Sequence, residues 1–168
     1  MDIFIINIKS AENVPYELLE QFKKKKITNK KTLIIHCLTY LMLDRILKEV
    51  YKIQNPEIIF NNKKPLLKSQ QKFFSISHSE EYITIAFSDY NCGIDIEKIK
   101  QRNLEKIAKR MSFHSSNLKE FYLEWTKYEA LYKLGNIAHS VSHFEFENYI
   151  ITALSENPNE IFEIYFQN

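Results

Sequence analysis

Glycine is the residue that this chain uses most sparingly, and its two positions constrain the fold. An average composition would give a chain of this length roughly a dozen glycines, but only Gly93 and Gly135 occur among the 168 residues. Glycine is favoured where the backbone needs a positive φ, or where another segment approaches too closely for a side chain. We therefore expect each glycine to occupy a position at which a side chain would be costly.

Hydrophobic periodicity divides the chain into strands and helices. Residues 2–8 are rich in isoleucine and predict a buried strand, and residues 15–22 predict a short helix. Thr28 and Asn29 are both favourable N-caps for a long helix that ends near Tyr51. Further strands are expected at 57–60, 73–77, 82–87, 94–98, 143–153 and 161–166, and helical patterns fill 99–134. This order predicts an α+β fold with antiparallel strand pairing.

Length and composition exclude several classes of protein. The 168 residues fit one domain, or two small lobes with a shared core. Cys37 and Cys92 match no zinc-ligand or redox-pair spacing, and we expect them to be buried thiols of a reducing compartment. No apolar run approaches the roughly 18–20 residues that cross a bilayer, and the Met-Asp start has no feature of a secretory signal. We therefore expect a soluble, cytoplasmic protein with no membrane partner.

Asp95 and Glu97 alternate with Ile94 and Ile96 in one of the expected strands. Successive side chains of a strand point to opposite faces, so both carboxylates lie on one face and both isoleucines on the other. Like charges this close oppose each other unless a cation or solvent compensates them. Taken alone, the pattern is more typical of an exposed acidic face than of a binding site.

A third carboxylate lies on the helix expected at 118–134. The aromatic arc of this helix consists of Leu118, Phe121, Tyr122, Trp125, Tyr128 and Tyr132. Glu129 falls near the centre of the arc, where a carboxylate costs free energy unless it is paired or binds a metal. An i,i+4 salt bridge between Glu129 and Lys133 is the simpler explanation.

Taken together, the three acids support a sharper hypothesis. Mg²⁺ is usually held by one to three carboxylates and keeps its other positions for water and substrate phosphates. Asp95, Glu97 and Glu129, with Lys133 nearby, fit a metal-assisted site for phosphoryl-type transfer.

Three segments resemble the motifs of one enzyme family. Residues 74–79 read Phe-Ser-Ile-Ser-His-Ser, residues 93–97 read Gly-Ile-Asp-Ile-Glu, and residues 125–130 read Trp-Thr-Lys-Tyr-Glu-Ala, followed by Lys133. In this order and at these separations they resemble the 4′-phosphopantetheinyl transferases, and most closely the surfactin-synthetase-activating type. The resemblance covers about residues 60–135.

The resemblance implies an enzyme that moves the phosphopantetheine arm of coenzyme A onto a serine of an apo acyl or peptidyl carrier protein. The reaction releases 3′,5′-ADP, and Mg²⁺ is the cofactor. The implied fold is a pseudo-dimer of two similar lobes, each an antiparallel sheet packed with a long helix, with coenzyme A in the cleft between them. In this chain the lobes would be residues 1–90 and 91–168, joined in one compact monomer.

The family's functional residues carry over by position in the motifs. The implied metal ligands are Asp95, Glu97 and Glu129. The implied coenzyme A contacts are Lys31, Lys64, Ser77, His78 and Lys133. The candidate catalytic residues are Glu129, Lys133 and His114.

The chain departs from the family's motifs in two places. The family has a lysine immediately before the helix glutamate, where this chain has Tyr128. Lys127 is no simple substitute, because it lies about 160° from Glu129 around the helix. A loop glutamate proposed as the base in the family is absent from residues 113–117, so His114 is the candidate base. The chain is also shorter than the two-lobed type, which predicts a trimmed second lobe.

Two other functions are open at this point. The departures are also typical of a degenerate homologue that binds coenzyme A or carrier protein without transfer, although retention of all three acids favours an enzyme. Lysine runs, 12 phenylalanines and 10 tyrosines raise the possibility of nucleic-acid binding. However, the net charge is only +2 and no glycine-aromatic RNA-binding motif occurs, so we expect no nucleic-acid partner.

Overall fold

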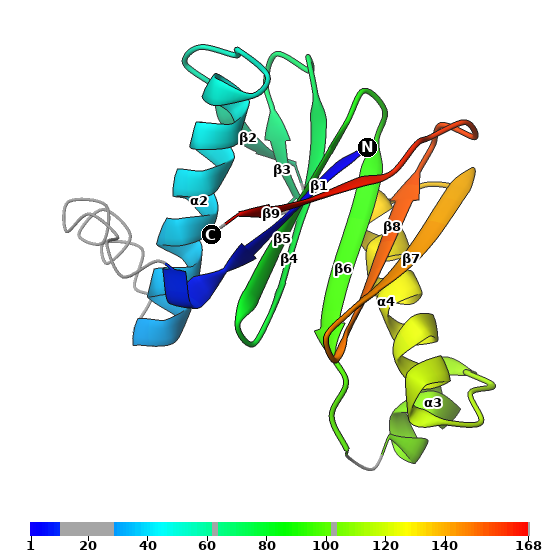
Figure 1. The fold of residues 1–168 in the computed structure, drawn as a ribbon. Coiled ribbons are helices and arrows are strands. Elements are labelled where there is room, and N and C mark those ends of the chain that lie inside the picture. The colour runs from blue at the N-terminus through cyan, green and yellow to red at the C-terminus, as the bar shows by residue number, and fades with distance from the viewer. Residues whose placement is uncertain (11–28, 62–63, 102–103, 168) are drawn as a thin grey trace.

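The computed structural model describes residues 1–10, 29–61, 64–101 and 104–167 (Figure 1). The helix predicted at 15–22 lies outside these residues. The first half contains β1 (Asp2–Asn7), the 3₁₀ helix η1 (Ile8–Ser10), α2 (Lys30–Glu49), β2 (Ile58–Asn61), β3 (Lys64–Leu67), β4 (Phe73–Ser79) and β5 (Tyr82–Ser88). The second half contains β6 (Cys92–Lys98), α3 (Glu105–Met111), α4 (Leu118–Leu134), β7 (Ser140–Phe146), β8 (Tyr149–Ser155) and β9 (Glu163–Gln167). The predicted mixed α+β class is therefore confirmed.

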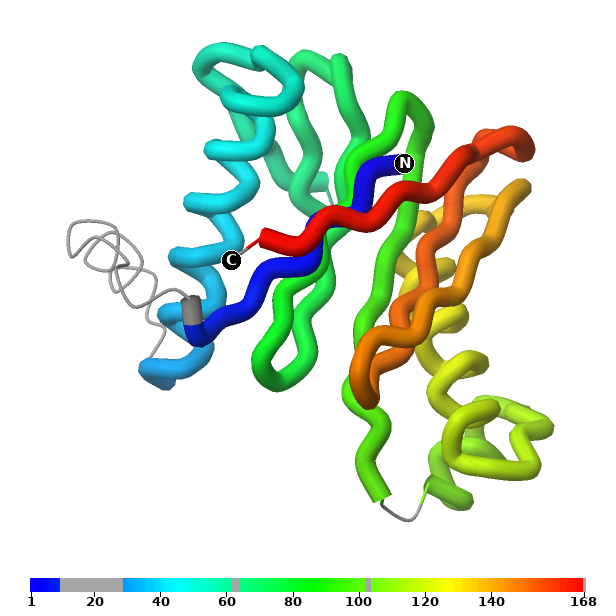
Figure 2. Tube along the Cα trace, viewed as in Figure 1, coloured from blue at the N-terminus to red at the C-terminus, as the bar shows by residue number. Residues whose placement is uncertain are grey.

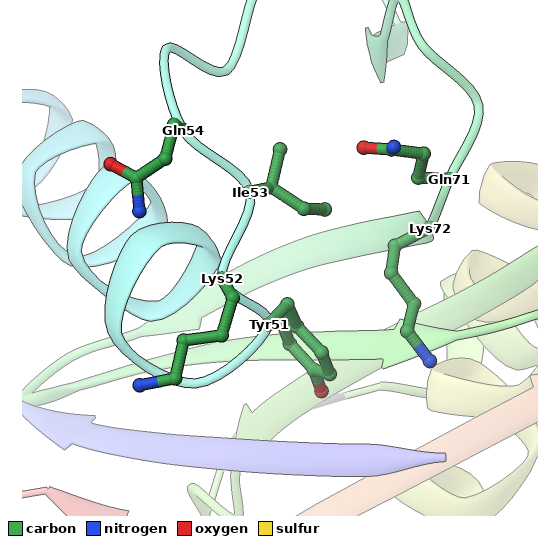
Figure 3. Close-up of a pocket in the computed structure, with 6 residues that line it drawn as sticks. All are labelled: Tyr51, Lys52, Ile53, Gln54, Gln71 and Lys72. Atoms are coloured by element: carbon green, nitrogen blue, oxygen red, sulfur yellow. The ribbon is translucent and has the colours of Figure 1, made fainter.

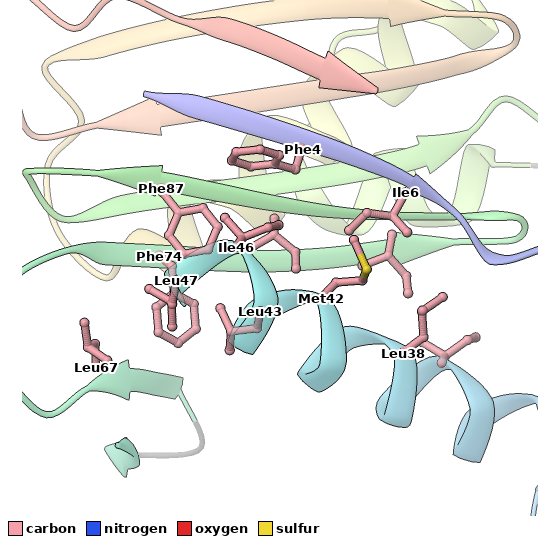
Figure 4. Close-up of a cluster of buried hydrophobic side chains, with 13 residues drawn as sticks. Phe4, Ile6, Leu38, Met42, Leu43, Ile46, Leu47, Leu67, Phe74 and Phe87 are labelled. Atoms are coloured by element: carbon pink, nitrogen blue, oxygen red, sulfur yellow. The ribbon is translucent and has the colours of Figure 1, made fainter. Parts of the chain in front are cut away.

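Helix α2 covers one face of a four-stranded sheet with the order β4-β5-β1-β9 (Figure 1). The helix begins after Asn29, whose side chain accepts a hydrogen bond from the backbone N–H of Thr32 at 3.1 Å, so one of the two predicted N-caps is confirmed. Buried side chains of α2 point at the strands (Figure 4). The core between helix and sheet contains Phe4, Ile6, Leu38, Met42, Leu43, Ile46, Leu47, Phe74 and Phe87.

A second sheet, with the antiparallel order β6-β8-β7, packs against the other face of the first. Side chains of β1 alternate between the two faces of the first sheet. Phe4 and Ile6 pack against α2, whereas Ile3 and Ile5 pack against Ile94 and residues of β8 in the second sheet. Helix α4 covers the outer face of the second sheet. The molecule is therefore layered as α2, first sheet, second sheet and α4.

The predicted antiparallel pairing needs one correction, at β9. This strand pairs in parallel with β1, in the register Asp2 to Glu163 through Ile6 to Gln167 (Figure 2). The last strand of the chain therefore belongs to the first sheet, and the expected boundary between residues 90 and 91 falls in the turn between β5 and β6. Such a pairing joins residues about 160 positions apart, and local periodicity carries no information about it.

Several element boundaries also differ from those predicted. Strand β4 continues through Ser79, so the Ser-His-Ser segment is strand and the turn is formed by Glu80, which has a φ of 51°. Lys64 and Pro65 lie in β3, a strand that was not predicted from the sequence. The strand region expected at 143–153 is a hairpin, β7 and β8, that turns at Glu147 with a φ of 53°.

The carboxylate of Glu81 forms hydrogen bonds that connect the two sheets at one end. Glu81, in the turn before β5, accepts a hydrogen bond from the Tyr149 hydroxyl of β8 and another from Lys98 Nζ of β6 at 3.0 Å. These two bonds lower the pKa of Glu81 to about 2, with the tyrosine contributing more than the lysine. The ionised carboxylate is therefore the form that the folded state favours.

Glu81→Gln is expected to destabilise the protein at neutral pH but not at low pH. The pKa of Glu81 lies below its ordinary value of 4.5 in the folded state, so its stabilising effect is complete above pH 4.5 and is lost as the pH falls toward 2. Urea unfolding between pH 7 and pH 2 measures the effect. The difference in free energy of unfolding between wild type and variant should shrink across that window, and a constant difference would contradict the assignment.

Both cysteines are free and buried, as predicted. Burial raises the pKa of the Cys92 thiol to about 12, so this thiol stays protonated and unreactive. Burial also raises the pKa of Cys37. Among the described helices, none combines the length and the apolar character that crossing a membrane requires.

Candidate functional site

Serine side chains of β4 face β6 and connect the two sheets. Ser75, Ser77 and Ser79 are buried and lie on one face of β4, because they are two residues apart. Ser75 Oγ accepts the backbone N–H of Ile94 at 3.1 Å, and Ser79 Oγ accepts that of Lys98 at 3.1 Å. Although the two strands belong to different sheets, hydroxyl groups thus bind backbone groups of β6 that face β4.

The predicted division of β6 into an apolar and an acidic face is correct, but the acidic face is not exposed. Ile94 and Ile96 are fully buried in the core between the sheets. Asp95 is only 4% exposed, and its Oδ1 accepts hydrogen bonds from Ser77 Oγ and Lys133 Nζ, both at 2.7 Å. Glu97 Oε2 accepts a hydrogen bond from Ser79 Oγ at 2.9 Å. The Ser-His-Ser and Asp-x-Glu motifs are therefore in direct contact.

The residues of the predicted aromatic arc of α4 are not all buried. The buried residues of the helix are Phe121, Tyr122, Thr126, Ala130 and Leu134. Two members of the expected aromatic arc are exposed, Tyr128 by 44% and Tyr132 by 78%. In the C-terminal half of the helix, the smaller side chains of Thr126 and Ala130 are buried instead of the two tyrosines.

Gly93 explains why the helix lies so close to the sheet. A Cβ atom at this position would lie 2.0 Å from the carbonyl oxygen of Ala130, a separation that no folded structure allows. Gly135 has the other role expected of a glycine: it ends α4 in the left-handed region, with a φ of 75°. The expectation that both glycines occupy positions where a side chain would be costly is confirmed.

The close approach places Lys133 against Asp95. Lys133 Nζ donates to Asp95 Oδ1 at 2.7 Å and to the carbonyl of Ile94 at 3.1 Å. The alternative salt bridge between Glu129 and Lys133 is therefore replaced by a pair that joins helix and strand. Glu129 is half-buried, and its pKa is raised by burial and by the charge of Asp95, with a smaller opposing effect of Lys133.

A pocket of about 650 Å³ opens beside this pair. It lies between the β2–β3 hairpin, β4 and the C-terminal end of α4, and its lining includes Asn61, Lys64, Pro65, Phe74, Tyr132 and Lys133. Lys64 Nζ donates to Asn91 Oδ1 at 2.9 Å and approaches the carbonyl of Leu134, the last helical residue, at 3.5 Å. Burial lowers the pKa of Lys64. Lys64 thus both lines the pocket and holds the end of α4.

Further basic groups surround His78 on the opposite face of β4. His78 is exposed, and its pKa is lowered by partial desolvation and by the charges of Lys133, His36 and Lys31, while Asp95 opposes them. Lys31, at the start of α2, also pairs with Glu80 at 3.4 Å. A region with several basic side chains around a partly desolvated imidazole suits an anionic ligand such as a phosphate group.

His114, the candidate base, lies in the loop before α4 and is exposed. Its backbone N–H donates to Glu124 Oε1 at 3.4 Å. Glu124 precedes Glu129 by five residues, or about 7.5 Å along the helix axis. The described contacts of His114 thus lie away from the Asp95 and Lys133 pair, and its catalytic role stays a prediction.

The proposed metal ligands, Asp95, Glu97 and Glu129, have the carboxylate oxygens that a divalent cation prefers. Their side chains do not converge on one point. Among the residues that the structure describes, no three acidic, histidine or cysteine side chains form a metal-binding group. However, Asp95 Oδ2 is buried without a hydrogen-bond partner in the described part of the chain. Burial and, to a smaller extent, the charge of Asp95 raise the pKa of Glu129, so an ionised Glu129 is unfavourable at this place without a further cation. A divalent cation would satisfy both groups.

A hydrogen-bond network that no sequence pattern predicted lies under α4. The hydroxyl groups of Thr126 and Thr152 are 2.6 Å apart, and Thr152 Oγ1 is 2.8 Å from His143 Nδ1. Because Thr126 donates its proton to the carbonyl of Tyr122 at 2.8 Å, it accepts from Thr152, which in turn accepts from His143. Thr152 lies between Asp95 and His143 in the sheet and is paired with each of them. These hydrogen bonds therefore hold α4 in register beside Asp95.

A second pocket, of about 430 Å³, lies at the C-terminal end of α2 (Figure 3). Its described lining consists of Tyr51, Lys52, Ile53, Gln54, Gln71 and Lys72. None of these is a predicted site residue. Its most polar groups are already paired, since Lys72 binds Asp89 at 2.6 Å and the Tyr51 hydroxyl binds Asp2. We therefore place the candidate site at the larger pocket.

Comparison with known proteins finds two sequences similar to this chain. No family model matches the chain. The chain is 30% identical to the 4′-phosphopantetheinyl transferase gsp of Aneurinibacillus migulanus in an alignment 148 residues long that covers 79% of this chain and 60% of the relative. It is also 30% identical to the 4′-phosphopantetheinyl transferase psf-1 of Bacillus pumilus in an alignment 122 residues long that covers 62% of this chain and 52% of the relative. The resemblance predicted from the motifs is confirmed, and the chain spans a little over half the length of these curated relatives.

Proposed function

We propose that this chain, a sequence relative of the 4′-phosphopantetheinyl transferases, transfers phosphopantetheine from coenzyme A to a serine of an acyl or peptidyl carrier protein. One observation carries the proposal: three motifs from separate parts of the chain meet at Asp95 Oδ1. Ser77 of the first motif and Lys133 of the third each bind this oxygen at 2.7 Å, and Asp95 belongs to the second. A buried acid with two such donors, at the edge of a large pocket, is costly unless it has a function.

The distribution of charge suits coenzyme A, which carries several phosphate groups. Lys31 and His78 lie on the face of the site that contains His36, and Lys64 and Lys133 line the pocket. Under the proposal, Ser77 and His78 contact nucleotide phosphates, Lys133 contacts the pyrophosphate, and Lys31 and Lys64 contact the nucleotide end. The aromatic and aliphatic lining near Phe74 provides apolar surface for the remainder of the ligand.

In the proposed reaction, the serine oxygen of the carrier protein attacks the phosphorus that bears the pantetheine arm. A phosphorus–oxygen bond forms to the serine, the bond to the bridging pyrophosphate oxygen breaks, and 3′,5′-ADP leaves with the bonding electron pair. Glu129, which is half-buried on α4 close enough to Asp95 to feel its charge, is the proposed acceptor of the serine proton. The positive charge of Lys133 offsets charge that builds up on the leaving phosphate.

Mg²⁺ is the proposed cofactor, and Asp95, Glu97 and Glu129 are the residues that would hold it. When bound, the ion would neutralise charge on the pyrophosphate. Glu129 would then be both a ligand and the proton acceptor, whereas exposed Tyr128 supplies no fixed charge in place of the family's lysine.

The finer description of the fold is also a proposal. Each long helix covers the outer face of one sheet, which supports two similar lobes, residues 1–90 and 91–168, with β9 crossing from the second to the first. We further propose a monomer that acts in the cytoplasm. The sheets meet through the serines of β4, so the site lies where the two lobes join.

Intact-mass spectrometry tests the proposed function. The protein is incubated with coenzyme A, Mg²⁺ and an apo acyl carrier protein, and we expect the carrier to gain the mass of one phosphopantetheine. EDTA should prevent the gain, and Glu129→Gln should slow it by about 100-fold or more, because a general base contributes roughly 10²–10⁴-fold. Full Mg²⁺-dependent transfer by Glu129→Gln would show that the role of Glu129 is wrong. No transfer to any of several carriers would overturn the proposed function.

A further inference from the structure

We infer that Ser79 is a positioning residue that restricts the carboxylate of Glu97, a proposed cation ligand, to the side of β6 that carries Asp95, an inference that rests on the proposed function. Ser79 forms two hydrogen bonds of different kinds. Its hydroxyl donates to Glu97 Oε2 at 2.9 Å and accepts the backbone N–H of Lys98 at 3.1 Å. A serine hydroxyl has one proton, so the two partners fix the direction of that proton.

Ser79 is one of the side chains that set the distance between β4 and β6. Strand β4 has no backbone ladder with β6 in the described sheets, so side chains set the spacing of the two strands. Ser75 anchors one end of the contact at Ile94 and Ser79 anchors the other at Lys98. Ser79 additionally binds the carboxylate of the residue before its backbone partner, so strand spacing and carboxylate direction depend on the same oxygen.

The Glu97 side chain has more conformational freedom than that of Asp95. Asp95 is buried, and its Oδ1 is bound by Ser77 and Lys133. Glu97 has a longer side chain with one more rotatable bond and lies only partly buried at the end of the strand. Partners of metal-ligating side chains commonly change metal affinity by about 10–100-fold when they are removed, because they orient the ligand.

Ser88, the last residue of β5, provides a closely matched control for Ser79, the last residue of β4. Its hydroxyl donates to Glu160 Oε2 at 2.9 Å and accepts the backbone N–H of Tyr90 at 3.1 Å, the same two distances as at Ser79. Ser88 is also buried, and it makes no described contact with the predicted metal ligands. Ser79→Ala and Ser88→Ala therefore remove equivalent hydrogen bonds, and only the first removes one from the site.

Mn²⁺ serves as the probe, titrated by calorimetry into the full-length protein in the presence of coenzyme A. We expect Ser79→Ala to weaken Mn²⁺ binding by about 10-fold or more, Ser88→Ala to leave it unchanged, and Ser79→Thr, which keeps the hydroxyl, to restore it. Both alanine variants should lower the urea midpoint by similar amounts. If Ser79→Ala does not fold, Ser79→Cys keeps the volume and should show the same loss of affinity.

Three outcomes would overturn the inference: wild-type protein that binds no Mn²⁺, normal Mn²⁺ affinity in Ser79→Ala, or equal losses in both alanine variants. The transfer assay on wild-type protein separates this result from the proposed function. Wild type that binds Mn²⁺ as expected without transferring phosphopantetheine would overturn the proposed function and leave the role of Ser79 intact. Wild type that transfers while Ser79→Ala binds Mn²⁺ normally would overturn the role of Ser79 alone.

Discussion

Gly93→Ala is expected to force α4 away from β6 and to remove both stability and transfer. The added Cβ would lie 2.0 Å from the Ala130 carbonyl oxygen and 3.0 Å from the backbone nitrogen of Leu134. These are backbone atoms, so no side-chain rotation relieves the clash. Overpacking a core typically costs about 1–3 kcal/mol, and a clash between backbones should cost at least the upper value. The displaced helix carries Glu129 and Lys133, and a shift of about 1 Å in an active site can cost 100-fold in rate.

Gly135→Ala is the matched control for this prediction. A Cβ at Gly135 meets no atom within 4 Å, so the only penalty is the positive φ of 75°, which costs about 1–2 kcal/mol for a residue other than glycine. Urea unfolding and the intact-mass assay compare the two variants. Gly93→Ala should lose clearly more stability and far more activity, whereas equal stability losses would show that the helix adjusts to the added atom.

The two glycines also show how far the sequence could predict this fold. Their scarcity marked two special positions, and the structure confirms a close approach at Gly93 and a helix end at Gly135. Scarcity alone does not reveal which segment approaches Gly93. Without that partner, hydrophobic periodicity grouped Tyr128 and Tyr132 on one arc with Tyr122, whereas both are exposed and Tyr122 is buried. The orientation of α4 is set by a contact with a distant strand, which a helical wheel does not contain.

The same distinction between local and distant contacts applies at the site. Period-two alternation correctly placed Asp95 opposite Ile94, because strand geometry is local. The partner of Lys133 was not local: a glutamate one turn away was the obvious choice, yet the lysine binds an aspartate on another element. Three motifs at particular separations predicted this meeting better than any single pattern. The serine row of β4 was also visible as an alternation in the sequence, although its partners on β6 were not.

Lys133→Met is expected to be the most damaging change within the site itself. It leaves the Asp95 carboxylate 4% exposed, with Ser77 as its donor and with Oδ2 still unpartnered in the described part of the chain. Removing one partner of a buried ion pair typically costs about 3–5 kcal/mol, because the remaining charge is uncompensated. Asp95→Asn should cost less, since the Lys133 side chain is 27% exposed and can turn its ammonium group toward solvent.

The double variant Asp95→Asn with Lys133→Met separates stability from function. With both charges gone, the buried position holds a neutral amide that Ser77 can still bind, so much of the stability lost in Lys133→Met should return. Urea unfolding of the four proteins should therefore give a coupling energy of about 1–3 kcal/mol between the two sites. Transfer should be lost in all three variants, because the proposed mechanism needs the carboxylate and the ammonium group themselves. Additive stability changes would show that the pair contributes no coupling, and transfer by the folded double variant would show that neither charge takes part in the reaction.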